Sequence, residues 1–213
     1  DSIYFSQSSD GGAHWTKESV AEGSYPVLAL YGTYLHLLWI EDKDTDHAKL
    51  MYAWKTLTDQ NFSTGSCLLY INADPLIESM GPPSLAVSGD SLFVTWESGM
   101  SPPLTLTHGL YMGSLPNTRA ASPPFYYQML DSANSYHSFP FWTDTVAQLQ
   151  TPSIAVSKTK NPYIVWNRLD NITHCFDIVS WKRELGIWTK EIVSNTASWK
   201  DEVEPYLTYE NGV

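Results

Sequence analysis

Pro83-Ser84-Leu85-Ala86-Val87, with Trp96 closing the apolar run that follows, is the stretch of sequence that decides the fold. The same pattern, here called the proline-to-tryptophan motif, runs from Pro26 to Trp39 and from Pro152 to Trp166. A fourth copy begins at Pro205. Copies that recur at intervals of roughly 50–70 residues indicate a repeat architecture in which each copy is one structural unit.

Each repeat contains four segments that predict β-strands. The apolar run behind the proline suits a buried strand that the chain enters from a loop. A turn signal such as Gly32-Thr33 leads into the tryptophan-containing run, so these two runs predict a hairpin. A third strand follows and ends on a small residue, which lets neighbouring repeats approach. The predicted third strands are residues 3–6, 50–53, 110–113 and 177–180, and the predicted fourth strands are residues 15–20, 67–71, 125–130 and 188–193.

Four antiparallel strands per repeat, arranged radially, form the blade of a β-propeller. The predicted fold class is therefore all-β, with about three and a half blades and little helix. The expected divisions are the end of one blade at 1–25, blades at 26–82, 83–151 and 152–204, and the start of the next at 205–213. We expect a ring of six to eight blades, completed by residues outside this sequence or by another chain. Closure of these strands into four blades is the alternative.

Residues 8–15 fit the pattern Ser-x-Asp-x-Gly-x-x-Trp through Ser8, Asp10, Gly12 and Trp15. An aspartate that accepts backbone N–H bonds, a glycine with positive φ and a tryptophan covering the apolar underside make a hairpin turn. The pattern resembles the Asp-box (BNR) repeat of the sialidase superfamily, in which it joins the third and fourth strands of a propeller blade. The resemblance implies that these residues are structural and lie away from any active site.

The resemblance does not bring sialidase chemistry with it. Sialidases grip a substrate carboxylate with three arginines, since guanidinium groups bind carboxylates in a bidentate manner. This chain has three arginines in all, Arg119, Arg168 and Arg183, and the first and last lie in places unsuited to a common site. The Tyr/Phe-Arg-Ile-Pro motif of the family is also absent. A sialidase-like exo-glycosidase would therefore need catalytic arginines from further blades.

Polar residues follow the tryptophan strands, in loops that open on one face of a propeller. They are Glu41, Glu97, Asn167 and Arg168, and they are the candidate ligand-binding residues. Carboxylates and amides beside aromatic rings suit a sugar, whose hydroxyls need polar partners and whose apolar face stacks on a ring. The alternative is that these side chains only satisfy the ends of the strands.

An acidic loop follows the first tryptophan strand. Asp42, Asp44 and Asp46 alternate there and present oxygen ligands on one side of the loop, as a calcium site requires. The loop lacks the glycine and distal glutamate of an EF-hand, and a merely solvated loop is the alternative. No histidine spacing indicates another metal, and His36 alternates with apolar neighbours, which predicts a core position.

An insertion rich in aromatic residues, at 132–150, precedes the repeat that begins at Pro152. It predicts either a plug over the ring or a contact surface for a partner. Asn61-Phe62-Ser63 and a second sequon at Asn171 are acceptors for N-glycans. Cys67 and Cys175 fall on unlike strands, which argues against a disulfide between them.

The net charge is −11 and the pI is about 4.8, which disfavours nucleic acid and anionic membranes as partners. No apolar run approaches the roughly 20 residues of a membrane span, so membrane insertion is not expected. We therefore predict an extracellular or cell-surface propeller that binds glycans or other surface proteins without catalysis. The alternatives are a sialidase-like exo-glycosidase and a structural component of a surface assembly.

Overall fold

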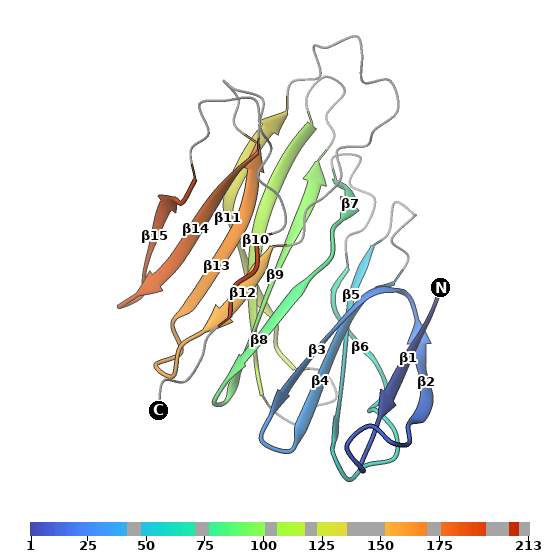
Figure 1. The fold of residues 1–213 in the computed structure, drawn as a ribbon. Coiled ribbons are helices and arrows are strands. Elements are labelled where there is room, and N and C mark those ends of the chain that lie inside the picture. Colours follow the sequence, from blue (N-terminus) through green and yellow to red (C-terminus); the bar gives the residue numbers. More distant parts are fainter. Residues whose placement is uncertain are drawn as a thin grey trace.

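The computed structural model describes residues 1–41, 48–70, 77–100, 106–117, 123–135, 152–169, 176–194 and 205–208. These residues form fifteen strands and contain no helix, so the all-β prediction is confirmed for the described part. Figure 1 shows the sheets standing side by side, from β1 and β2 at the N-terminal end to β12–β15 at the other. No helix among the described residues is long and apolar enough to cross a membrane.

Three antiparallel sheets follow a two-stranded one made of β1 (Ser2–Gln7) and β2 (Thr16–Glu22). The first comprises β3 (Ser24–Tyr31), β4 (Tyr34–Glu41), β5 (Lys49–Thr56) and β6 (Ser66–Tyr70). The second comprises β7 (Ile77–Met80), β8 (Ser84–Ser88), β9 (Ser91–Met100), β10 (Leu106–Pro116) and β11 (Tyr126–Ser135). The third comprises β12 (Ser153–Val156), β13 (Pro162–Leu169), β14 (Phe176–Glu184) and β15 (Ile187–Ile192). The first and third pair their strands in chain order, and in the second both β7 and β8 pair with β9, which is followed by β10 and β11. Such antiparallel sheets are the blades of a partial β-propeller.

Three details of the predicted strands are wrong. The third strands do not end on the small residues: β5 continues from Ala53 to Thr56. The second sheet has an additional strand, β7, which pairs with β9 beyond the end of β8. The strands that follow the motif prolines are not uniformly buried. Strand β12 is buried throughout, whereas Leu28 and Leu30 of β3 are about half exposed. Among the described residues, β12 lies between β8 and residues 205–208, whereas β3 packs against β8 and makes fewer contacts with β1.

The apolar core lies between the sheets. Successive residues of a strand point to opposite faces, so each tryptophan strand contributes to two interfaces. Each motif tryptophan faces the preceding sheet, and the residue after it faces the following sheet. The shared clusters pair Trp39 with Ile3, Trp96 with Leu38, and Trp166 with Phe93. The tryptophans are thus structural residues, each no more than 2% exposed.

The proline-to-tryptophan motif also links successive sheets through a repeated hydrogen bond. The Ser84 hydroxyl accepts the backbone N–H of Ile154 at 3.3 Å, and the Ser153 hydroxyl accepts that of Leu207 at 2.9 Å. In both cases the side chain of the second residue of one motif accepts a hydrogen bond from the backbone of the third residue of the next motif. Residues 205–208 contain no strand, but this bond places them beside β12 as the predicted fourth copy requires. Val27 occupies the serine position in the first motif and has no hydroxyl.

Gly113 of β10 has no room for a side chain. A Cβ at this position would collide with the ring of Phe125. We expect Gly113→Ala to lower the free energy of unfolding by about 1–3 kcal/mol, because overpacking forces the ring to move. Urea unfolding measures the stability of this variant and of the control Ser114→Ala, which changes the neighbouring residue. Equal stability of the two variants would show that the ring adapts at no cost.

His36 lies in the core, as predicted, and is 1% exposed. Its Nδ1 atom lies 3.0 Å from the hydroxyl of Tyr52, and the two rings stack. Burial lowers the pKa of His36 from 6.5 to about 4, which keeps the imidazole neutral in the folded protein at neutral pH. Burial also raises the pKa of Tyr52.

This pKa shift predicts a loss of stability in mild acid. Above pH 6.5 His36 is neutral in both states and has no effect on pH dependence. Between about pH 6.5 and 4 only the unfolded chain takes up the proton, so the free energy of unfolding falls, by roughly 3 kcal/mol in all. Urea unfolding at pH 7.0, 5.5 and 4.5 measures the slope, which His36→Leu should remove and the exposed His14→Ala should keep. An unchanged slope in His36→Leu would contradict the assignment.

Candidate ligand-binding site

The candidate residues lie where the tryptophan strands end, at the upper end of β9 and β13 in Figure 1. Strand register shows which of them are equivalent. Glu97 lies opposite Leu110, and Asn167 lies opposite Ile178. The matching residue of the first sheet is Ile40, opposite Leu50, because Glu41 is one position further along. The expectation of three equivalent polar residues is therefore wrong for Glu41.

Glu41 forms a pair of its own. Its Oε1 atom accepts a hydrogen bond from the Lys49 ammonium at 2.7 Å, and both side chains are about one-third exposed. The two residues are also partners in the register of β4 and β5. A cross-strand ion pair at a strand end accounts for this carboxylate, and the structure does not bring it together with Glu97 and Asn167.

Glu97 is buried between the second and third sheets and is 3% exposed. It shares a strand face with Phe93, which belongs to the apolar cluster between those sheets. Leu110, its cross-strand partner, belongs to the same cluster. A carboxylate beside such a cluster is costly to bury unless polar groups meet it.

Asn167 is the most unusual side chain of the candidate site. It is 1% exposed, and neither its Nδ2 nor its Oδ1 atom has a hydrogen-bond partner among the described residues. A buried polar group left unpaired costs about 1–3 kcal/mol. Because Trp166 faces the second sheet, Asn167 points from the other face of β13 toward the following blade. The donors and acceptors of the carboxamide are therefore not met by any residue that the structure describes.

Asp177 of β14 is a further polar residue that the sequence did not single out. It is 6% exposed, and its Oδ1 atom has no partner among the described residues. The register places it opposite Arg168 and beside the Asn167–Ile178 pair. The Arg168 side chain lies outside what the structure describes. The signal for Asp177 was a lone carboxylate at the start of an apolar strand, which is too common to indicate a site.

Other predicted features fall outside the described residues. These are the calcium candidates Asp42, Asp44 and Asp46, residues 136–150 of the aromatic insertion, Cys175 and the sequon at Asn171. Within the described part, no group of three or more His, Cys, Asp or Glu side chains could hold a metal ion. Cys67 is an exposed free thiol.

The turn after β1 has the hydrogen bonds that its sequence predicts. Asp10 Oδ1 accepts the backbone N–H of His14 at 2.9 Å, and the Ser8 hydroxyl accepts that of Gly12 at 2.8 Å. Hydrogen bonds to its carboxylate, first from the His14 backbone and then from the His14 ring and the Ser8 hydroxyl, lower the pKa of Asp10 to about 2. Gly12 has φ of 96°. Trp15 differs from the prediction, because it is 65% exposed and holds the turn by donating from Nε1 to the Gly12 carbonyl at 3.0 Å.

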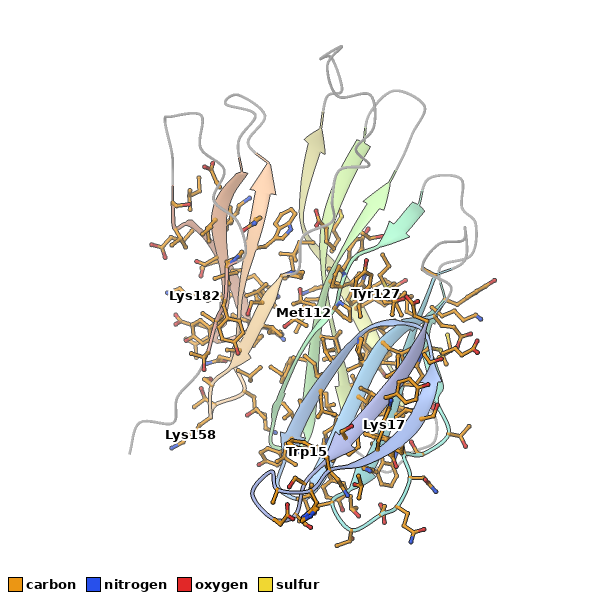
Figure 2. All side chains as sticks on the ribbon, turned by 45° about the vertical axis from the view of Figure 1, so that its right-hand side comes forward. Trp15, Lys17, Met112, Tyr127, Lys158 and Lys182 are labelled. Carbon is orange, nitrogen blue, oxygen red and sulfur yellow. The ribbon has the colours of Figure 1, made fainter. Side chains whose placement is uncertain are left out.

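This turn lies at the end of the sheets opposite the candidate site. Figure 1 shows the turn below β1 and β2 and the ends of β9 and β13 above, and Figure 2 marks Trp15 at the lower end. A structural role for Asp10 and Trp15, far from the candidate ligand, agrees with this placement.

Comparison with known proteins identifies the fold of this chain. No protein-family model and no curated protein sequence matches this chain. Two solved structures of the GH93 α-L-arabinofuranosidase of Fusarium graminearum match, one in complex with an iminosugar inhibitor and one with arabinobiose. Each is 14% identical with a TM-score of 0.54, and the match covers 89% of this chain and 54% of the enzyme. The chain thus spans about half the length of a glycosidase whose fold it shares.

Proposed function

We propose that this chain forms part of a carbohydrate-binding β-propeller, with its ligand site where β9 and β13 end. The observation that carries the proposal is the Asn167 carboxamide, which is buried and has no hydrogen-bond partner among the residues that the structure describes. Glu97 occupies the equivalent place in the neighbouring sheet. A carboxamide offers both donors and acceptors, and a carboxylate offers acceptors, which is what sugar hydroxyls require.

Two further observations support a carbohydrate ligand. The GH93 enzyme with the same fold was solved with a bound iminosugar and with arabinobiose. The turn at residues 8–15 makes the hydrogen bonds expected of an Asp-box, which supports kinship with sialidase-like propellers. The proposal includes an extracellular or cell-surface location, binding without hydrolysis, and glycans or glycosylated surface proteins as partners.

A glycan-array screen of the 213-residue chain tests this proposal. We expect retention of at least one class of glycan, with loss of signal in Asn167→Ala and in Glu97→Gln. Gln128→Ala removes an exposed carboxamide from β11 and is the matched control, which should bind like the wild type. A chain that retains no glycan, or variants that bind as the wild type does, would overturn the proposal.

A second candidate function is an exo-glycosidase. Glu97 and Asp177 are two buried carboxylates near the ends of neighbouring sheets, and paired carboxylates are the usual catalytic groups of glycosidases. The release of methylumbelliferone from an α-L-arabinofuranoside and from a sialoside distinguishes the two functions. Turnover that Glu97→Gln abolishes would establish the enzyme, whereas binding without turnover would favour the first proposal.

A further inference from the structure

A second polar cleft lies at the other end of the sheets, beside the turn of residues 8–15. Its volume is about 280 Å³, and it opens between the β1–β2 sheet and the segment 57–65 that follows β5. Its lining includes Phe5, Gln7, Glu18, Lys55, Gln60 and Asn61. Lys17, labelled in Figure 2 at the lower part of the β1–β2 sheet, also borders it. None of these residues belongs to the candidate site at Asn167.

The floor of the cleft is a buried ion pair held by aromatic rings. The Lys55 side chain is 1% exposed and donates to Glu18 Oε1 at 3.0 Å. Its ammonium group also lies 4.3 Å from the ring centroid of Phe5 and 4.9 Å from that of Phe62. The two rings meet edge to face at 5.3 Å. These contacts fix the Glu18 carboxylate in place before any ligand arrives.

The walls of the cleft carry three carboxamides, from Gln7, Gln60 and Asn61. Among the described residues, none of these side chains has a hydrogen bond. Each offers donors and an acceptor, and the Glu18 carboxylate adds an acceptor at the floor. Lys55 already balances the charge of Glu18, and the Lys17 ammonium lies 3.7 Å from the centroid of the Tyr4 ring, so the cleft is polar with one further cationic group at its border. Such a set of partners suits a neutral ligand rich in hydroxyl groups.

We infer that this cleft binds one saccharide ring. Its volume of about 280 Å³ lies just below the range of roughly 300–1,000 Å³ that small-ligand pockets span, which fits a single sugar better than an oligosaccharide. The sugar can come from either of two sources. Asn61 begins the sequon Asn61-Phe62-Ser63, so the ring can belong to the chain's own N-glycan, or it can belong to a free glycan. Because it uses other residues, the inference does not depend on the proposed function.

Saturation-transfer NMR tests the inference on unglycosylated protein made in bacteria, with N-acetylglucosamine and with arabinose as probes. We expect at least one sugar to bind, and Gln7→Ala/Gln60→Ala to weaken it about tenfold through the loss of two carboxamides. Gln128→Ala and Asn167→Ala should leave this binding unchanged. Binding of neither sugar, or equal affinity in the double variant, would overturn the inference. Loss in Asn167→Ala alone would assign the sugar to the other site and overturn it as well.

Protein from a eukaryotic secretory host identifies the source of the sugar. If the cleft holds the chain's own glycan, peptide mapping finds a glycan on Asn61 and the free sugar no longer binds. Asn61→Gln, which removes the acceptor but keeps a carboxamide, then restores binding of the free sugar. If the cleft serves free glycans, protein from both hosts binds the probe equally. Both outcomes support the cleft as a saccharide site, and they differ only in where the sugar comes from.

Discussion

Trp96→Ala is expected to lower the free energy of unfolding by about 3–5 kcal/mol, the usual cost of deleting a large aromatic side chain from a core. Trp96 is 1% exposed and lies in the cluster between the first and second sheets. Its ring stacks on Tyr111 with centroids 5.5 Å apart and also contacts Phe125 and Tyr127. The substitution therefore opens a cavity and removes three ring contacts at once.

Trp15→Ala is the matched control for this prediction. Trp15 is 65% exposed, and its main contact is the hydrogen bond to the Gly12 carbonyl. Its loss should cost about 1 kcal/mol, the worth of one hydrogen bond near the surface. Urea unfolding followed by circular dichroism measures both variants. Similar losses at the two positions would contradict the view that the motif tryptophans hold the sheets together.

Glu18→Ala should lower the free energy of unfolding by about 3–5 kcal/mol, because it leaves the Lys55 ammonium buried without a carboxylate. The Lys55 side chain is 1% exposed, and Glu18 Oε1 lies 3.0 Å from its Nζ atom. The flanking rings of Phe5 and Phe62 attract the ammonium, but they replace only part of the lost ion pair. Lys55→Met combined with Glu18→Gln should recover most of the loss, since no buried charge then remains.

The Glu41–Lys49 pair provides the control for this second prediction. Both of its side chains are about one-third exposed, so Glu41→Ala should cost no more than about 1 kcal/mol. The stabilities of the wild type, Glu18→Ala, Lys55→Met/Glu18→Gln and Glu41→Ala are measured by chemical unfolding at one ionic strength. This compares the buried ion pair with the exposed one. If Glu18→Ala were no more damaging than Glu41→Ala, Lys55 would have to reach water in the folded protein.

Much of the fold could be predicted because its determinants are local. The proline-to-tryptophan motif and its turn signals placed the hairpins, and the positive φ of Gly32 fits the predicted turn between β3 and β4. The Asp10 turn was predictable for the same reason, since every bond that holds it lies within residues 8–15. Strand β7 was missed because residues 77–80 lack alternation, and only the length of β9 gives them a partner.

The sites were harder to predict because they depend on register and on contacts between sheets. Glu41 was grouped with Glu97 although it lies two positions after its tryptophan and Glu97 lies one, and the pairing of Ile40 with Leu50 confirms that it is displaced by one position. Whether the Asn167 carboxamide finds a partner depends on residues distant in the sequence, and none of those that the structure describes supplies one. Lys55 and Glu18 lie in different sheets, so no sequence pattern joins them.

The affinity of Asn167→Ala for the glycan that the array identifies tests the proposed function most directly. Calorimetric titration of that glycan into the wild type, Asn167→Ala and Gln128→Ala gives the three dissociation constants. The account predicts that Asn167→Ala binds about tenfold or more weakly, because the buried carboxamide supplies hydrogen bonds that nothing else replaces, and that Gln128→Ala matches the wild type. Equal dissociation constants for the wild type and Asn167→Ala would contradict it.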